Sequence, residues 1–192
     1  ALLEGAIAQS HIGQLGRYLR RLAVDGCQRH NLFLNIHPDE FSEGWLVRPD
    51  DGMTTHGEEV FLEITESVPL SHYKHCHSVL AEVRARGAKV AVDDLGAGYS
   101  NLKYIVDLEP EVVKLDRELV ANLRRESRLH SLVRSLVDLC TQLGARVVAE
   151  GIETREELCA VIDAGVHFGQ GYYLARPNPE LVSIKWDELL SD

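Results

Sequence analysis

The chain has 192 residues, of which 45% are hydrophobic and 26% are charged, a composition typical of a globular protein with one sizeable core. Its formal net charge of −10 argues against binding to nucleic acid polymers or anionic membranes, but not against a small phosphorylated ligand held through metal ions. The sequence has no apolar run of about 18 residues, no signal peptide and no CxxC pair among its four cysteines. We therefore expect a single domain, residues 1–192, in a cytoplasmic protein with reduced thiols.

Strand-like and helix-like patterns alternate along the chain. The expected strands are short apolar runs at residues 32–35, 60–63, 90–92, 112–116, 146–150 and 166–170. The expected helices lie at residues 7–27, 71–86, 100–108, 129–140 and 154–164, with a last one from residue 181. A loop is expected over residues 45–58. This alternation is typical of repeated βα units, and it predicts an α/β fold with a parallel sheet.

Polar side chains stand at the end of strand after strand. They are Asn35, Glu63, Asp93 with Asp94, Lys114 with Asp116, Glu150, and Gln170. In parallel α/β folds the C-terminal ends of the strands converge on the active site, and a core strand has no structural need for a terminal carboxylate. An acidic cluster with one asparagine and one lysine suits a divalent metal centre that acts on a phosphate. A rim of solvated charges is the less favoured alternative.

The stretch KVAVDDLGAGYSNL, residues 89–102, is the centre of this prediction. Its adjacent carboxylates, Asp93 and Asp94, repel each other unless a cation lies between them, and Mg²⁺ and Mn²⁺ prefer such oxygen ligands. Neighbouring side chains in a strand point to opposite faces, but we expect the chain to curl here so that both carboxylates reach one site. Lys114 could then stabilise charge on phosphorus or position a water molecule. Taken alone, the stretch could also be a solvated acidic turn.

Six segments, in this order, resemble the motifs of the EAL domain family, the phosphodiesterase of bacterial cyclic di-GMP signalling. They are NIHP from Asn35, EITES from Glu63, DDLGAGYSNL from Asp93, VVKLD from Val112, AEGIET from Ala149 and QGYYLARP from Gln170. The resemblance covers residues 31–177. It implies a TIM-barrel-like fold and hydrolysis of cyclic di-GMP to the linear dinucleotide with Mg²⁺ or Mn²⁺, two ions in the complete domain.

The resemblance also implies roles for individual residues. Metal ligands, or side chains next to them, are expected at Asn35, Glu63, Asp93, Asp94 and Glu150. Lys114 would match the active-site lysine of the family and Asp116 its acidic neighbour, so catalysis is assigned to Lys114, Glu150 and Asp116. Glu66 would match the glutamate that steadies the loop after Asp94. Glu153 would match a carboxylate that contacts the ligand or a loop, and Gln170 a residue near the metal-bound water or the ligand.

One departure from the family pattern is the Glu-Ala-Leu motif, which does not occur in the sequence. About six strands are expected, whereas a TIM barrel has eight. The first residue is Ala1 rather than Met, so we expect a domain that is incomplete at its N-terminus. The motif glutamate, a phosphate-contacting arginine and two strands would then lie upstream, together with possible sensory domains. A homodimer is also expected from the resemblance.

Other interpretations of the sequence stay open. The chain could be a catalytically inactive EAL-like receptor for cyclic di-GMP or a protein-interaction scaffold. It could also be an unrelated barrel enzyme, such as an aldolase that uses Lys114 as a Schiff base. The cluster His72, His75, Cys76 and His77 suggests zinc, but an exposed helix face is favoured. His37 could contact a ligand or have a structural role.

Overall fold

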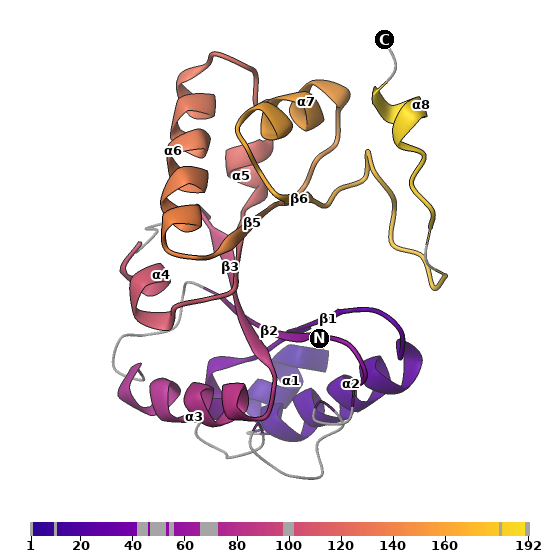
Figure 1. Cartoon of the computed structure of the whole chain (residues 1–192). Helices are drawn as coiled ribbons and strands as arrows, with labels where there is room; N and C mark the ends of the chain where they lie inside the picture. The colour runs from indigo at the N-terminus through magenta and orange to yellow at the C-terminus, as the bar shows by residue number, and fades with distance from the viewer. Residues whose placement is uncertain are drawn as a thin grey trace. The chain divides into compact units, whose positions relative to one another are not determined.

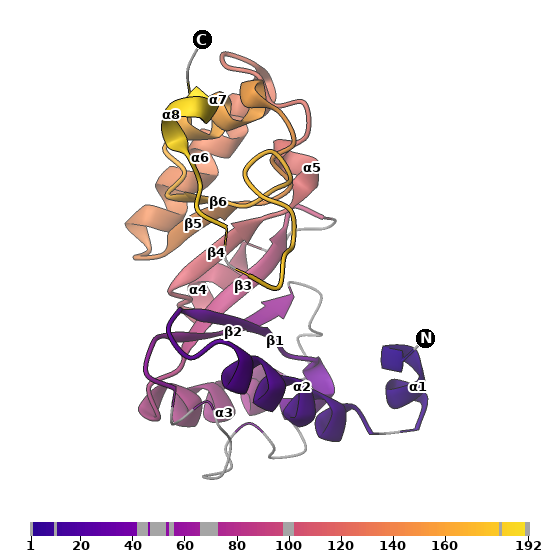
Figure 2. The same ribbon diagram turned by 90° about the vertical axis from the view of Figure 1, so that its right-hand side faces the viewer.

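The computed structural model describes residues 2–9, 11–41, 46, 53, 56–65, 73–97, 102–180 and 182–190 (Figures 1 and 2). Two compact units divide the chain, Ala1–Ala91 and Val92–Asp192. Strand β3 (Lys89–Leu95) begins in the first unit and ends in the second. The expectation of a single domain stays a prediction. Within the described part of the chain, we find no helix whose length and apolar composition would let it cross a bilayer.

The first unit is built on two parallel strands. Its elements before β3 are α1 (Leu2–Ala8), α2 (Ile12–Gly26), β1 (Leu32–Asn35), the 3-10 helix η1 (Pro38–Phe41), β2 (Val60–Thr65) and α3 (Tyr73–Ala85). Strands β1 and β2 pair from Leu32 with Val60 to Asn35 with Glu63. The apolar side chains of Phe61 and Leu80 are almost fully buried and belong to the core of this unit.

The prediction of one helix over residues 7–27 is wrong, because the chain forms α1 and α2 instead. His11 separates them with φ −106° and ψ 15°, outside the helical region. Its N–H donates to the carbonyl oxygen of Ala6 at 2.8 Å, a bond that spans five residues and ends α1. The apolar spacing on both sides of this break is helical, so periodicity alone does not reveal it.

The second unit continues the alternation of strands and helices. After β3 it contains α4 (Lys103–Leu108), β4 (Val112–Leu115), α5 (Arg117–Val120), α6 (Arg128–Gln142), β5 (Arg146–Ala149), α7 (Arg155–Asp163), β6 (Phe168–Gly169) and α8 (Trp186–Leu190). Strands β4 and β5 are parallel, with Leu115 opposite Ala149, and β5 and β6 are parallel, with Ala149 opposite Gly169. The ends of these strands therefore lie side by side, where polar residues follow them.

The six described strands follow one another in the sheet in chain order, β1 to β6. Parallel neighbours in chain order, joined by helices, are the pattern of a TIM-barrel-like βα repeat, so the predicted fold class is confirmed. Strands β2 to β5 are buried on both faces for most of their length, whereas β1 alternates between buried and exposed residues and β6 is exposed. In β4, for example, all four residues are buried.

Helix caps explain where several elements begin. The expected strand 112–116 ends at Leu115, because the Asp116 carboxylate accepts a hydrogen bond from the Glu118 N–H at 2.7 Å and caps α5. Ser127 caps α6 and Thr154 caps α7. The last strand is shorter than residues 166–170, because the Val166 N–H still bonds to the Val161 carbonyl at the end of α7.

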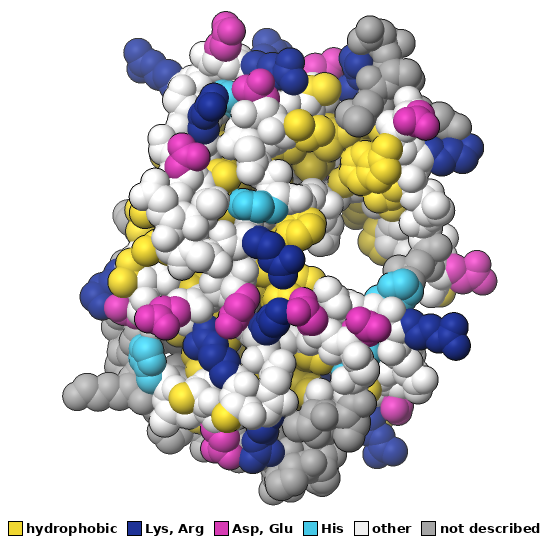
Figure 3. Space-filling model, in the orientation of Figure 1, with side chains coloured by type: hydrophobic (Ala, Val, Ile, Leu, Met, Phe, Trp, Pro, Cys, Tyr) yellow, Lys and Arg dark blue, Asp and Glu magenta, His cyan; other side chains and the backbone are white. Residues whose placement is uncertain are grey.

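An apolar hollow of about 230 Å³ lies between α7, β6 and α8 in the second unit. Ile162, Phe168 and Trp186 are each about half exposed there. Apolar side chains are visible on this part of the molecule in Figure 3. The described residues that line the hollow include no carboxylate, lysine or arginine, so it is separate from the polar residues that follow the strands.

Candidate active site

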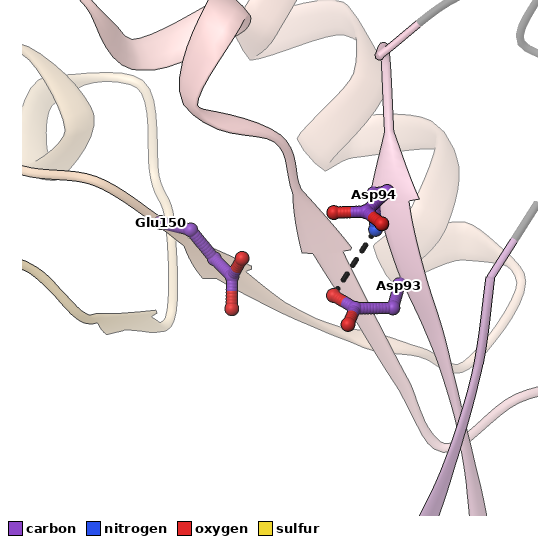
Figure 4. A group of neighbouring side chains, drawn as sticks. All are labelled: Asp93, Asp94 and Glu150. Atoms are coloured by element: carbon purple, nitrogen blue, oxygen red, sulfur yellow. Dashed lines mark hydrogen bonds between the residues drawn. The ribbon is translucent and has the colours of Figure 1, made fainter. Parts of the chain in front are cut away.

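Two carboxylates lie at the end of β3 because the backbone turns there. Asp93 is 8% exposed, whereas Asp94 has a φ of +59°, in the left-handed region that Asp and Asn enter more readily than other side chains. The Asp94 N–H donates to Asp93 Oδ1 at 3.0 Å, which holds the turn (Figure 4). The left-handed residue interrupts the pleat, so neighbouring side chains need not point to opposite faces.

Lys114 joins the end of β3 to the end of β5. Its side chain is buried in β4, and its Nζ lies 3.0 Å from Asp93 Oδ1 and 2.6 Å from Glu150 Oε1. The Glu150 N–H donates to the Leu115 carbonyl at 3.1 Å, so the residue after β5 is fixed against the end of β4. One ammonium group on β4 therefore bridges two carboxylates at the ends of β3 and β5, the strands on either side of it in the sheet.

Asp93, Asp94 and Glu150 each offer an oxygen, and these oxygens all lie within 4.8 Å of one another (Figure 4). Burial raises the pKa of Asp94, the charges of Asp93 and Asp116 raise it further, and Lys114 opposes the change. Burial also raises the pKa of Glu150, against the hydrogen bond from Lys114. Three carboxylates share one lysine, so the cluster has an excess of negative charge. An all-oxygen set with this excess fits a hard divalent cation such as Mg²⁺, Mn²⁺ or Ca²⁺.

The other two expected metal ligands lie in the first unit. Asn35 and Glu63 are register partners at the ends of β1 and β2, and the Glu63 side chain is buried while Asn35 is exposed. Their assignment to the metal stays a prediction. Glu66 lies outside the described residues. The backbone N–H of His37 donates to Glu40 Oε1 at 3.1 Å, and its ring Nδ1 accepts from the Asp39 N–H at 3.3 Å, so these contacts are local, and a ligand contact of His37 stays a prediction.

A cavity of about 570 Å³ opens beside Glu150, a size common for small-molecule sites. The expected site residues Asp116, Glu153 and Gln170 all line it. The Gln170 N–H donates to the Ala149 carbonyl at 2.8 Å, and Glu153 Oε1 lies 2.9 Å from Arg117 Nη2. The fold of the second unit therefore brings four of the expected site residues to one cavity wall.

Comparison with known proteins identifies the family. The family model described as "EAL domain" matches residues 2–177. The chain belongs to the EAL domain family. Among characterised relatives, this EAL chain is 34% identical over 165 residues to cyclic di-GMP phosphodiesterase RocR of Pseudomonas aeruginosa, covering 84% of this chain and 42% of RocR. The EAL chain spans less than half the length of RocR and of the other curated relatives that it matches.

Solved structures of EAL proteins are similar over most of the chain. The EAL domain of Mycobacterium smegmatis DcpA has a TM-score of 0.77 and 30% identity, covering 86% of this chain and 80% of that domain. A Klebsiella pneumoniae BlrP1 complex with manganese and cyclic di-GMP has a TM-score of 0.77 and 32% identity, covering 91% of this chain and 48% of BlrP1. These similarities agree with the TIM-barrel-like arrangement of the strands.

Several residues of the EAL chain's cavity were not singled out from the sequence. Arg117 and Arg176 bring positive charge to the cavity, and the Arg176 guanidinium lies 4.7 Å from the ring centroid of Tyr172. Arg176 belongs to the QGYYLARP segment, so this motif could have indicated that Arg176 lies at the site. Tyr172 also lines the cavity. Tyr173 instead donates through its hydroxyl to the Leu189 carbonyl at 3.3 Å in α8.

The alternative metal site is not supported by described side chains. His72 lies outside the described residues, and the side chains of His75 and Cys76 are not described either. Within the described part of the chain, Asp93, Asp94 and Glu150 are the one group of acidic, histidine or cysteine side chains close enough to hold a metal ion.

Proposed function

We propose that the chain contributes to metal-dependent hydrolysis of cyclic di-GMP to the linear dinucleotide in bacterial second-messenger signalling. The observation that carries this proposal is the cluster of Asp93, Asp94 and Glu150 around Lys114 at the ends of three consecutive strands. Membership of the EAL domain family supports it, as do relatives named cyclic di-GMP phosphodiesterases and the manganese and cyclic di-GMP complex of BlrP1. Asn35 and Glu63 are proposed as further ligands.

A bound Mg²⁺ or Mn²⁺ would polarise a phosphoryl oxygen and make water more acidic. In the hydrolysis, a water oxygen forms a bond to phosphorus and gives up a proton to a base. One ester P–O bond breaks, and the leaving oxygen takes up a proton to become the free hydroxyl of the linear dinucleotide. Glu150 is suited to accept the proton from water, because it stands at the cavity wall and burial raises its pKa. Lys114 holds Glu150 and Asp93 in place and supplies a positive charge near the phosphate.

The cavity wall carries the carboxylates of Asp116, Glu150 and Glu153 as well as two arginines, so an anionic ligand would depend on the arginines and on a bound cation. Arg117 and Arg176 line the cavity, and guanidinium groups match the geometry of phosphate oxygens. Asp116 lies on the same wall, and we propose it as the acidic neighbour of the reacting groups. A homodimer and upstream sensory domains are proposed as partners of the chain.

Removal of one ligand tests the metal assignment. Asp93→Asn removes a charged ligand, so Mn²⁺-dependent cleavage of cyclic di-GMP should be lost, and Mn²⁺ affinity in calorimetry should fall at least tenfold. Asp25→Asn makes the same chemical change at a residue whose side chain is 67% exposed and pairs with Arg21, so it serves as the control. Equal turnover in Asp93→Asn and Asp25→Asn would overturn the metal assignment.

Hydrolysis should be measured on this chain and on a longer form of the protein, if its gene encodes one. The alternative is a catalytically inactive cyclic di-GMP receptor. Nucleotide binding without turnover in both forms would support the receptor. The Schiff-base alternative is disfavoured, because two carboxylates stabilise the charged form of Lys114, whereas a Schiff-base lysine must react as the neutral amine.

A further inference from the structure

Glu157 is a buried carboxylate of α7 that lies outside the cavity and makes an unusual number of backbone hydrogen bonds. Its side chain is 6% exposed. Oε1 accepts from the Asn122 N–H at 2.7 Å, and Oε2 accepts from the N–H groups of Glu153 at 2.8 Å and Thr154 at 3.0 Å. The Glu157 N–H in turn donates to Thr154 Oγ1 at 3.2 Å.

A helix cap explains only part of this arrangement. The reciprocal bonds between Thr154 and Glu157 form a capping box, which satisfies the start of α7. The bonds from Asn122 and Glu153 are additional, and Asn122 belongs to a different segment, the turn after α5. Glu157 therefore joins the loop of residues 150–154 to the end of α5.

The same loop also lies against the start of α5. Gly151 has a φ of +70°, and a Cβ there would lie 2.6 Å from Arg117 Cγ, so the backbone approaches α5 closely. The Arg117–Glu153 pair adds a contact of 2.9 Å, but its side chains are 62% and 42% exposed, and such pairs contribute little. The buried Glu157 is thus the stronger restraint on the loop.

Charge strengthens this restraint. Burial would raise the pKa of Glu157, but the backbone hydrogen bonds from Glu153, Asn122 and Thr154 outweigh it and hold the pKa below its ordinary value. The group is therefore ionised near neutral pH, and hydrogen bonds to a carboxylate are stronger than those between neutral groups.

We propose that Glu157 is a positioning residue for the active site. Its carboxylate fixes the loop of residues 150–154 against the end of α5 and so sets the position of Glu150 beside Lys114. Only three residues separate Glu150 from Thr154, so a shift of the anchored end displaces Glu150. The link to catalysis rests on the proposed function, whereas the restraint on the loop and on the metal ligand Glu150 can be measured without turnover.

The test compares Glu157→Ala with Glu156→Ala, the same change at an exposed neighbour in the first turn of α7. Three quantities are measured in Mn²⁺: kcat and KM for cyclic di-GMP, Mn²⁺ affinity, and hydrogen exchange of the amides of residues 122 and 150–154. We expect Glu157→Ala to lower kcat about 10–100-fold with KM within about threefold, and to weaken Mn²⁺ binding about tenfold. Exchange should quicken at residues 122 and 153, whereas Glu156→Ala should match the wild type.

A second, milder variant keeps the test decisive if Glu157→Ala does not fold. Glu157→Gln keeps one oxygen for the Glu153 and Thr154 amides but places an NH₂ group near the Asn122 N–H, so it should give intermediate values in all three measurements. If Glu157→Ala does not fold, this variant decides the question. If the wild type does not cleave cyclic di-GMP, the proposed function fails, but Mn²⁺ affinity and hydrogen exchange still test the positioning role. Wild-type exchange and Mn²⁺ affinity in a folded Glu157 variant would overturn the proposal.

Discussion

Replacement of Lys114 by alanine is the most informative single change at the candidate site. It removes the ammonium that lies 3.0 Å from Asp93 and 2.6 Å from Glu150. The three side chains are only 9%, 11% and 19% exposed, so water compensates little for the lost charge. Removing one partner of a buried ion pair costs about 3–5 kcal/mol. In a chain of this size each kcal/mol lowers the Tm by about 2–4 °C, so we expect a fall of about 6–20 °C.

Thermal unfolding in EDTA and in Mn²⁺ measures this effect. In EDTA the Lys114→Ala variant should show the full fall in Tm, because the carboxylates then have neither the lysine nor a metal ion beside them. In Mn²⁺ the variant should recover about 2.7 kcal/mol at a free concentration of 100 times Kd. Lys103→Ala is the control, because its side chain is 65% exposed in a pair one turn apart with Asp107 in α4, and such pairs contribute about 0.3–0.5 kcal/mol.

Two results would refute this reasoning. A Tm in EDTA that falls no further for Lys114→Ala than for Lys103→Ala would mean that the lysine does not compensate the buried carboxylates. Failure of Mn²⁺ to stabilise the Lys114 variant would mean that the cluster of Asp93, Asp94 and Glu150 does not take up a divalent ion. In Mn²⁺, turnover should also be lower in this variant than in the wild type, because the proposed reaction uses the lysine charge.

Two further changes test the loop and its anchor. Gly151→Ala should lower the free energy of unfolding in urea by more than Gly144→Ala. Both residues have positive φ, so alanine at either position costs about 1–2 kcal/mol, but only at Gly151 would the added Cβ also clash with Arg117. Equal losses would show that the close approach is unimportant. Stability should also fall as the pH drops below 4.5, because the folded pKa of Glu157 is held below that value and its contribution is lost on protonation. Glu157→Gln should flatten this part of the stability curve, and an unchanged slope would contradict the assignment.

The positions of the strands could be predicted because their apolar runs are short and bounded by polar residues, but β2 and β3 are longer than predicted and β6 is shorter. Residues 32–35 form a strand with the predicted bounds, and the ends of β4 and β5 differ from the prediction by one residue. Helix α5 was missed because it has four residues, too few to show a helical period. The break between α1 and α2 was missed because it depends on backbone dihedrals at His11 rather than on apolar spacing.

Some residues of the candidate site could be predicted from the sequence and others could not. Its carboxylates could be found from the sequence, because charged residues after buried strands have no packing role. Its supporting residues were harder to find, since Arg117 and Glu157 act through contacts between α5 and the loop of residues 150–154. The spacing of Thr154 and Glu157 does match a capping box, so part of that signal was present in the sequence. The bond to Asn122 joins residues 35 positions apart, which local patterns do not predict.

The left-handed backbone of Asp94 restricts how this position can be altered. Asparagine enters that region about as readily as aspartate, whereas glutamate has no such preference. Glutamate therefore keeps the negative charge but strains the turn, whereas asparagine keeps the turn but loses the charge. Within natural side chains, shape and charge are both preserved at this position only by aspartate itself.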